Sequence, residues 1–187
     1  MEYSLENTLK NFFSKDQQSL DELIDQWNKE VLINRKQRLI HFGDKENYIY
    51  YIEKGTCIIT YPDQGEDRIL GFGYPGTFLF SPSILSDTSS EEEVTAIKKM
   101  TLKAIHKDYF FSFIENHLEA KNNWMKQLQN LLVAQIYRQV DLLIASPQER
   151  YQRLLNRSPH VFQFIPNKYI AAYLRMTPET FSRLQNS

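Results

Sequence analysis

The chain has 187 residues, of which 42% are hydrophobic and 13% aromatic, so it can bury the core of one large domain or of a medium and a small one. Its one cysteine, Cys57, excludes an intrachain disulfide and a four-cysteine zinc or iron–sulfur centre. The formal net charge of −1 points by itself to no class of partner.

Residues 1–27 are predicted to be helical, because their apolar residues repeat at helical spacing. Glu2 and Glu6 stand where a signal peptide would have its apolar core, and the apolar runs of the chain are too short to span a bilayer. We therefore expect a cytoplasmic protein with no membrane partner. The repeating apolar residues are Leu5, Leu9, Phe12, Phe13, Leu20, Leu23, Ile24 and Trp27.

From about residue 31 to residue 105 the pattern changes to short β-rich runs, each ended by turn residues. Gly43, Gly55, Gly65 and Gly76 mark these ends, and glycine suits turns that need a positive φ. Strands at such spacing with glycine punctuation are typical of an antiparallel barrel or jelly roll.

A long helix is predicted from about residue 118 to residue 145, with an apolar stripe and no Gly or Pro inside it. The stripe has more apolar surface than a small barrel can cover. A helix of a second subunit is the simplest cover, and a helix packed on its own domain is the alternative. The expected dimer contacts are Trp124, Leu128, Leu132, Ile136 and Leu143.

After residue 145 the sequence predicts a smaller helical region. Ser146 can cap a helix over 147–156 that has Pro147 at its first position. A β-like run is expected over 161–165, ahead of two short helices around a turn at 174–176. Thr177 is the predicted N-cap of the last helix, with Pro178 following it.

The outer face of that last helix is polar, because Phe181 and Leu184 share its inner face. A second helix that begins with polar side chains is what a helix-turn-helix presents to the major groove, although an ordinary helical hairpin has the same pattern. Charge favours DNA: residues 1–120 have 13 Lys/Arg and 20 Asp/Glu, a net of −7, whereas residues 121–187 have 9 and 3, a net of +6.

The order of these parts resembles the cyclic-AMP receptor protein/FNR (Crp/Fnr) family of bacterial transcription regulators. Four segments are similar to family motifs: YYIEKG at 50–55, GFGYPGTF at 71–78, Thr95-Ala96 with the strand and DYF that follow, and MTPETFSR at 176–183. The resemblance covers nearly the whole chain and rests on the order and spacing of the motifs together.

The resemblance implies an α+β fold with three parts. They are an antiparallel β-roll (a cyclic-nucleotide-binding-like jelly roll) over 1–115, a dimerisation helix over 116–145, and a helix-turn-helix (winged-helix-like) domain over 146–187. It further implies a non-enzymatic, dimeric transcription regulator under an unidentified effector. The alternative is a sensor or protein-interaction module of the same fold that has lost DNA binding. The implied partners are duplex DNA, a second copy of the chain and RNA polymerase.

The ligand cassette departs from the family. Cyclic-nucleotide-binding members use an Arg to pair with the cyclic phosphate, since a buried anion needs a positive fork and backbone donors. Residues 76–96 contain no Lys or Arg, and Asp87 and the acidic run 91–93 would repel a phosphate. A cyclic nucleotide is therefore disfavoured. The residues expected to line a pocket are Gly76, Phe78, Ser83 and Thr95.

The sequence lacks the residue patterns of metal sites and of common catalytic sites. His41, His106, His117 and His160 are scattered singly, so no metal site is expected, and a haem held by one His is the alternative that stays open. No nucleophile elbow, P-loop or pair of catalytic carboxylates occurs. The chain is interpreted as a non-enzyme.

In the family's mode of DNA binding, Glu179 accepts from cytosine, and Arg183 donates to guanine or a phosphate. The remaining predicted contacts are Thr177, Thr180 and Ser182 on the last helix and Lys168 on the helix before it. Arg175 is a departure, because the family often has Gly in this turn. A second is the short stretch that follows Arg183, in which no strand is expected. The sequence does not indicate the operator, or whether genes are activated or repressed.

Overall fold

The computed structural model of the chain describes residues 3–13 and 17–186. Its N-terminal region is helical, as the apolar spacing predicts, and Leu9, Leu23 and Trp27 are buried in the adjoining core. The side chains of Phe12 and Phe13 lie outside the part that is described. The two helices are α1 (Leu5–Phe13) and α2 (Gln17–Gln26).

A six-stranded, wholly antiparallel sheet follows, which confirms the predicted β-region. Its order is β1-β6-β3-β4, with β2 paired to β6 and β5 paired to β3, and the short helix α3 (Ser83–Ser86) lies between β5 and β6. The strands are β1 (Lys29–Ile33), β2 (Arg38–Ile40), β3 (Tyr48–Asp63), β4 (Glu66–Gly73), β5 (Phe78–Leu79) and β6 (Glu93–His106).

The turn predicted at Gly55 is wrong, because β3 continues through this residue for 16 residues in all. Gly55 has φ +87°, and an added Cβ would lie 2.2 Å from the Lys99 carbonyl oxygen of β6. The glycine thus permits a close approach of two strands at a point where their register shifts, rather than a reversal of the chain.

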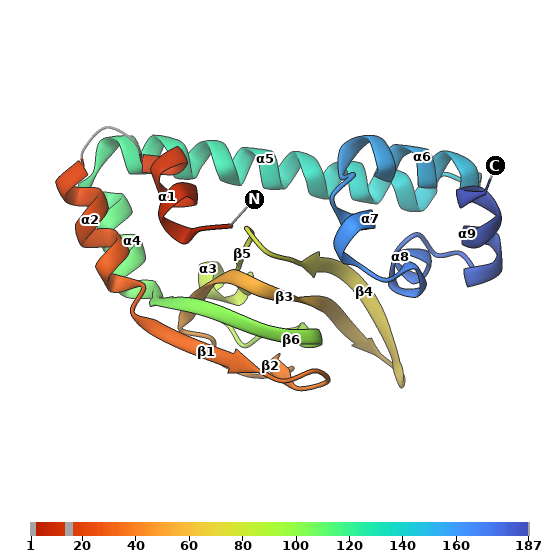
Figure 1. Ribbon diagram of the computed structural model, residues 1–187, viewed down its shortest axis with the longest axis horizontal. Helices are drawn as coiled ribbons and strands as arrows, with labels where there is room; N and C mark the ends of the chain where they lie inside the picture. Colours follow the sequence, from red (N-terminus) through yellow and green to blue (C-terminus); the bar gives the residue numbers. More distant parts are fainter. Residues whose placement is uncertain (1–2, 14–16, 187) are drawn as a thin grey trace.

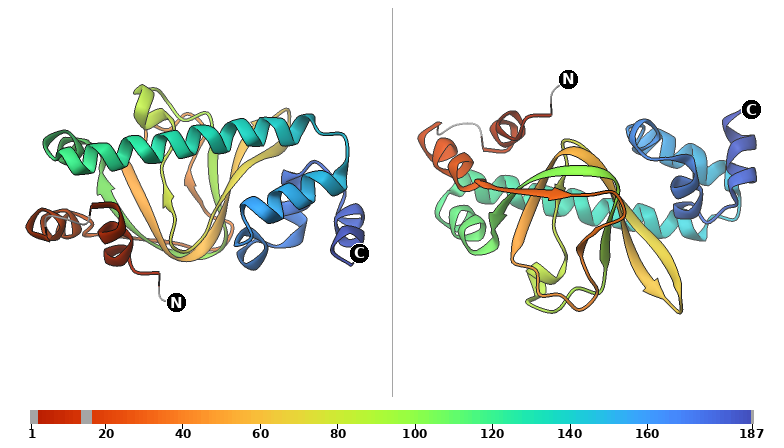
Figure 2. Two further views of the ribbon diagram at one scale, coloured as in Figure 1. Left: turned by 90° about the horizontal axis from the view of Figure 1, so that it is seen from above. Right: turned by 60° about the horizontal axis from the view of Figure 1, so that its bottom comes forward.

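Two helices lead out of the sheet, α4 (Lys107–Asn116) and α5 (Leu118–Leu143). The predicted long helix is confirmed. In Figure 1, α5 runs across the molecule above the sheet, from α1, α2 and α4 at one end to the C-terminal helices at the other. Figure 2 shows the same helix crossing the strands from above. Among the described helices, none combines the length and the hydropathy that a bilayer crossing requires.

The C-terminal unit is built from four helices, α6 (Pro147–Arg157), α7 (Val161–Phe164), α8 (Asn167–Tyr173) and α9 (Pro178–Gln185). Residues 144–186 contain no strand, so the β-like run expected over 161–165 is wrong. Its apolar residues alternate in sequence, but Val161 and Ile165, four residues apart, are the two that are buried. They face one side of a single helical turn that follows Ser158 and Pro159.

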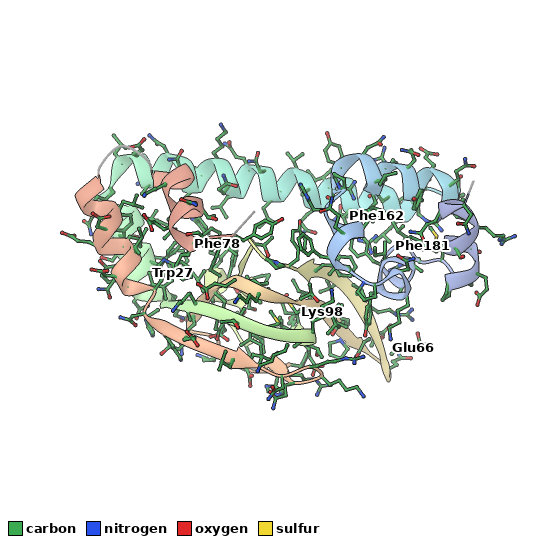
Figure 3. All side chains as sticks on the ribbon, viewed as in Figure 1. Trp27, Glu66, Phe78, Lys98, Phe162 and Phe181 are labelled. Atoms are coloured by element: carbon green, nitrogen blue, oxygen red, sulfur yellow. The ribbon has the colours of Figure 1, made fainter. Side chains whose placement is uncertain are left out.

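The C-terminal unit packs against the sheet through one hydrophobic cluster. Leu154, Ile170, Leu174 and Phe181 are buried inside the unit, and Ile97 of β6 joins the same cluster. Figure 3 shows Phe162 and Phe181 in this region, at the end of the molecule opposite Trp27. The unit therefore shares apolar surface with the sheet of its own chain.

Candidate DNA-binding surface and ligand cleft

The α8–α9 hairpin is held by local signals that the sequence displays. The Thr177 hydroxyl accepts a hydrogen bond from the backbone N–H of Thr180 (3.3 Å), which caps the start of α9 before Pro178. Phe181 is buried beneath α9, with its ring stacked 6.3 Å from that of Phe162. Arg175 has φ 53°, so the turn takes the left-handed conformation despite the absence of Gly.

The outer face of α9 is exposed and polar. Glu179, Ser182 and Arg183 are exposed and Thr180 is half-buried. The Arg183 guanidinium donates to the Thr180 hydroxyl (3.4 Å). The pKa of Glu179 is lowered first by its own backbone N–H, then by Thr177 and by the nearby positive charge of Arg183. At neutral pH the face therefore presents a carboxylate and a guanidinium beside three hydroxyls.

Lys168 lies on the helix before this face, as predicted. It is the second residue of α8 and is exposed, and its ammonium lies 4.7 Å from the centre of the Tyr169 ring. The six predicted contact residues (Lys168, Thr177, Glu179, Thr180, Ser182 and Arg183) thus belong to one compact hairpin, with five of them exposed.

A buried ion pair that was not predicted from the sequence joins α5 to α6. The Asp141 side chain has no exposed surface. One of its oxygens accepts from Arg153 Nε at 2.7 Å, and the other accepts from Arg157 Nη2 at 2.6 Å. Burial alone raises the pKa of this carboxyl, but the hydrogen bonds and charges of the two arginines outweigh it and lower the pKa. Asp141 is therefore ionised and fixes the direction in which α6 leaves α5.

Two further arginines secure the same joint through backbone carbonyls. Arg138 of α5 donates to the carbonyl oxygen of Tyr173 (2.6 Å), and its guanidinium carbon lies 3.7 Å from the centre of the Tyr173 ring. Arg150 of α6 donates to the carbonyl oxygens of Ile144 (2.6 Å) and Arg175 (3.3 Å). A signal in the sequence did exist, since Arg138, Asp141, Arg153 and Arg157 repeat at helical spacing, but their pairing across 12 to 16 residues is not readable from it.

Aromatic side chains connect the C-terminal unit to the edge of the sheet. The ring of Phe164 in α7 stacks on that of Tyr74, just after β4, with centroids 5.4 Å apart and planes 3° apart. Phe72 of β4 packs on Tyr173 of α8 (5.1 Å), and Lys98 of β6 donates to the carbonyl oxygen of Phe164 (3.3 Å). The segment that leads into the predicted ligand cassette therefore contacts the unit that contains α9.

A cleft of about 1630 Å³ lies between the β3–β4 hairpin, the start of the cassette, α5 and the α8–α9 turn. Apolar side chains make up much of its wall, and Glu92, Arg68, Arg138 and Arg175 are among its charged residues. From α5 it takes Leu131, Gln135, Arg138 and Leu142, which share one helix face. The cassette contributes Phe78, Leu79, Phe80, Pro82 and Glu92.

Of the four predicted pocket residues, only Phe78 lines this cleft. Gly76 has φ +88° and lies against the Tyr3 ring, 2.5 Å from where its Cβ would stand. Ser83 is buried, with its hydroxyl bonded to that of Ser81 (2.7 Å). Thr95 pairs with Arg38 in the sheet. Gly76, Ser83 and Thr95 thus lie in a turn, a serine cluster and a strand outside the lining of this cleft, and their part in a ligand pocket stays a prediction.

Residues 76–96 of the cassette contain no Lys or Arg that could pair with a cyclic phosphate. Its serines are occupied with one another, because Ser83 donates to Ser81 and Ser81 donates to Ser90 (3.3 Å). Glu92 brings a carboxylate to the cleft in place of a cation. Of the arginines nearby, Arg68 pairs with Asp63 and Glu66, at the hairpin tip labelled in Figure 3. In residues 3–13 and 17–186, no three His, Cys, Asp or Glu side chains gather in a metal-binding group.

Next to the cleft-lining face, α5 exposes an apolar stripe. Leu132 is 62% exposed, Ile136 50% and Leu143 85%, and they share a face at i, i+4 and i+11. Leu128 is half-buried. Trp124, also a predicted dimer contact, is half-buried, and its ring packs within the chain on Phe110 (5.4 Å) and Phe80 (6.0 Å). The exposed stripe thus excludes Trp124, which anchors the start of α5 to the core.

Comparison with known proteins agrees with this architecture. Residues 30–117 match the family model described as the cyclic nucleotide-binding domain. The chain matches no curated protein by sequence.

Solved structures extend the similarity over nearly the whole chain. The Thermus thermophilus catabolite activator protein has 19% identity and a TM-score of 0.60, covering 96% of this chain and 85% of that one. FixK2 from Bradyrhizobium japonicum has 16% identity and a TM-score of 0.69, covering 84% and 82%. The c-di-GMP-responsive global regulator CLP of Xanthomonas campestris has 14% and 0.64, covering 91% and 90%. The fold is therefore that of a cyclic nucleotide-binding domain followed by helices, as in these three structures.

Proposed function

We propose that this protein is a dimeric transcription regulator of the Crp/Fnr type that reads duplex DNA with α9, which would make the α8–α9 hairpin a helix-turn-helix. The observation that carries the proposal is the outer face of α9. Three hydroxyls, one carboxylate and one guanidinium stand on a capped helix whose other face is anchored by buried Phe181. Side chains of these types read base edges and phosphates in the major groove.

The rest of the chain is consistent with such a role. The exposed stripe of α5 suits a two-fold dimer, which would set two α9 helices on half-sites about one helical turn (~34 Å) apart. The similar structures include a global regulator whose reported role is to link cell–cell signalling to gene expression. In this proposal residues 1–115 sense an effector, residues 116–145 join the subunits, and residues 146–187 bind DNA in the cytoplasm, with RNA polymerase as a further partner.

One observation favours the alternative of an interaction module without DNA binding. Several of the cations that make residues 121–187 basic are used inside the protein. Arg153 and Arg157 pair with Asp141, and Arg138 lies against Tyr173. The surface left to meet phosphates is therefore less basic than the sequence suggests, which makes a direct binding test necessary.

The test compares two substitutions by fluorescence anisotropy on duplex DNA at several salt concentrations. If Arg183 forms a bidentate pair with guanine, Arg183→Ala should cost about 1–3 kcal/mol and relax the preference at one base position per half-site. Lys168→Ala should instead weaken binding to all duplexes and reduce the salt slope by about one.

Lys126→Ala provides a matched control, because Lys126 is an exposed lysine of α5 away from the hairpin. It should leave affinity and slope unchanged. If Arg183→Ala and Lys168→Ala are both silent, the interaction-module alternative replaces DNA binding.

A further inference from the structure

The charge of the cleft at its cassette end points to a class of ligand. Glu92 lines the cleft and is half-buried. Burial raises the pKa of this carboxyl, and the hydrogen bond with Ser81 offsets only part of the rise. Over residues 3–13 and 17–186, no ion pair joins Glu92 to a Lys, Arg or His. A carboxylate taken out of water without a cation is costly, and a bound cation would remove that cost.

The neighbouring acidic residues do not share this position. Glu93 is buried on the other side of the strand and pairs with Arg38 (3.0 Å), and Glu91 is exposed. Asp87 is exposed and pairs with Lys107 (3.4 Å). Of the acidic residues in 76–96, Glu92 alone lines the cleft.

The cleft that Glu92 lines also has apolar walls. Phe78 and Phe80 come from the cassette, Ile59 from β3 and Leu131 from α5. The arginines of the cleft belong to its other parts: Arg68 lies in the acidic hairpin, Arg138 is bound to Tyr173, and Arg175 lies in the α8–α9 turn. The cassette end thus combines aromatic and aliphatic surface with one carboxyl group that has no cationic partner among the described residues, the reverse of what a phosphate requires.

We propose that this cleft binds an apolar small molecule carrying a positively charged amino group, with the ammonium on Glu92 and the apolar body against Phe78, Phe80 and Leu131. The inference rests on the proposed function insofar as this ligand would be the effector. Because Phe72 and Tyr74, which precede the cassette, pack on Tyr173 and Phe164, a ligand here acts next to the contact between the sheet and the C-terminal unit.

The test uses two probes of the same shape and opposite charge, tryptamine and indole-3-propionate, with the full chain in calorimetry and thermal unfolding. Wild-type protein should bind tryptamine at least about tenfold more tightly than indole-3-propionate, and tryptamine should raise its Tm. Glu92→Gln should remove this preference, because the amide keeps the shape and loses the charge. Glu91→Gln, at the exposed neighbour, should retain it.

Equal affinity for the two probes, tighter binding of indole-3-propionate, no binding of either, or full retention of the preference in Glu92→Gln would each overturn the inference. Glu92→Gln should have a Tm no lower than wild type, since it removes an unpaired half-buried charge. The wild-type comparison of the two probes needs no variant, so it holds even if the variant fails to fold. DNA binding measured on the same samples without probe reports the proposed function separately.

Discussion

Asp141 joins the C-terminal unit to α5 through a buried ion pair. Its carboxylate is fully buried in α5 and accepts from Arg153 and Arg157 of α6 at 2.7 and 2.6 Å. The arginines keep part of their surface in water, so the cost of desolvation falls mainly on the aspartate. A pair of this kind contributes more to direction than to stability, because both charges must keep their mutual hydrogen bonds.

Replacing Asp141 with Asn should lower the free energy of unfolding by about 1–3 kcal/mol at pH 7, since one buried acceptor becomes neutral while two arginines lose their charge partner. The pKa of Asp141 is depressed in the folded protein, so its contribution is present above the ordinary Asp pKa of about 3.9 and is lost as pH falls below it. Urea unfolding should therefore show a smaller difference in free energy of unfolding between wild type and variant near pH 3 than at pH 7.

Glu149→Gln is the control for this prediction, because Glu149 is an exposed carboxylate on the same helix α6. It should change stability by less than about 0.5 kcal/mol. If the difference in free energy of unfolding between wild type and Asp141→Asn stays constant from pH 7 to pH 3, the charge of Asp141 is not the source of the effect.

At the scale of elements, α5 presents two neighbouring faces with different uses. Leu131, Gln135 and Leu142 line the cleft, and the residues one position later, Leu132, Ile136 and Leu143, form the exposed apolar stripe. The second face has the spacing of a helix–helix seam. We expect a second copy of α5 to cover it.

Leu132→Glu with Ile136→Glu should convert a wild-type dimer to monomers at micromolar concentration, because each buried carboxylate without a partner costs at least about 2 kcal/mol at such an interface. Analytical ultracentrifugation measures the change. Leu85→Glu, which alters an equally exposed leucine of α3, should leave the dimer intact. A wild type that sediments as a monomer at this concentration would refute the two-fold arrangement.

The elements that local signals define were predictable, and those that depend on distant contacts were not. The Ser146 and Thr177 caps act within three residues, and the predicted starts of α6 and α9 agree with the structure. The β-like run predicted over 161–165 was wrong because the alternation of apolar residues does not determine which of them are buried. The turn predicted at Gly55 was wrong because the sequence does not distinguish a glycine that permits close approach of two strands from one that forms a turn.

The lining of the cleft also depends on contacts between distant parts of the sequence, so only part of it was predictable. Phe78 was found because it lies in the cassette motif, but Leu131 and Arg138 come from a helix more than fifty residues away. The absence of Lys and Arg from the cassette was readable, whereas the placement of Glu92 against an apolar wall required the fold.

At the scale of the whole molecule, the C-terminal unit and the sheet form one packed body. Phe164 stacks on Tyr74 and also meets Tyr3 edge-on, with centroids 5.9 Å apart, so the N-terminal segment, the turn before the cassette and α7 meet at one point. A structural change at the cassette should therefore alter the packing of the unit that contains α9.

Phe164→Ala should loosen this contact, at a cost of about 1–3 kcal/mol for a half-buried aromatic side chain. Hydrogen exchange should become faster in residues 72–74 and in α7 and α8, and stay unchanged in the paired centres of β3 and β6. Phe162→Ala offers a contrast, because Phe162 packs on Tyr151 and Phe181 inside the unit. It should speed exchange in α6 and α9 instead. Unchanged hydrogen exchange at residues 72–74 in Phe164→Ala would mean that the stacking of Phe164 on Tyr74 does not couple the sheet to the C-terminal unit.

Selection of bound sequences from a random duplex pool tests whether α9 reads duplex DNA from a two-fold dimer. Two inverted half-sites with centres about one helical turn (~34 Å) apart should be enriched. Affinity for the enriched duplex should fall steeply between low and moderate salt, and the enrichment should weaken when Arg183→Ala is used. A pool that stays unenriched after repeated rounds with the wild-type protein, at low salt, would contradict this mode of DNA binding.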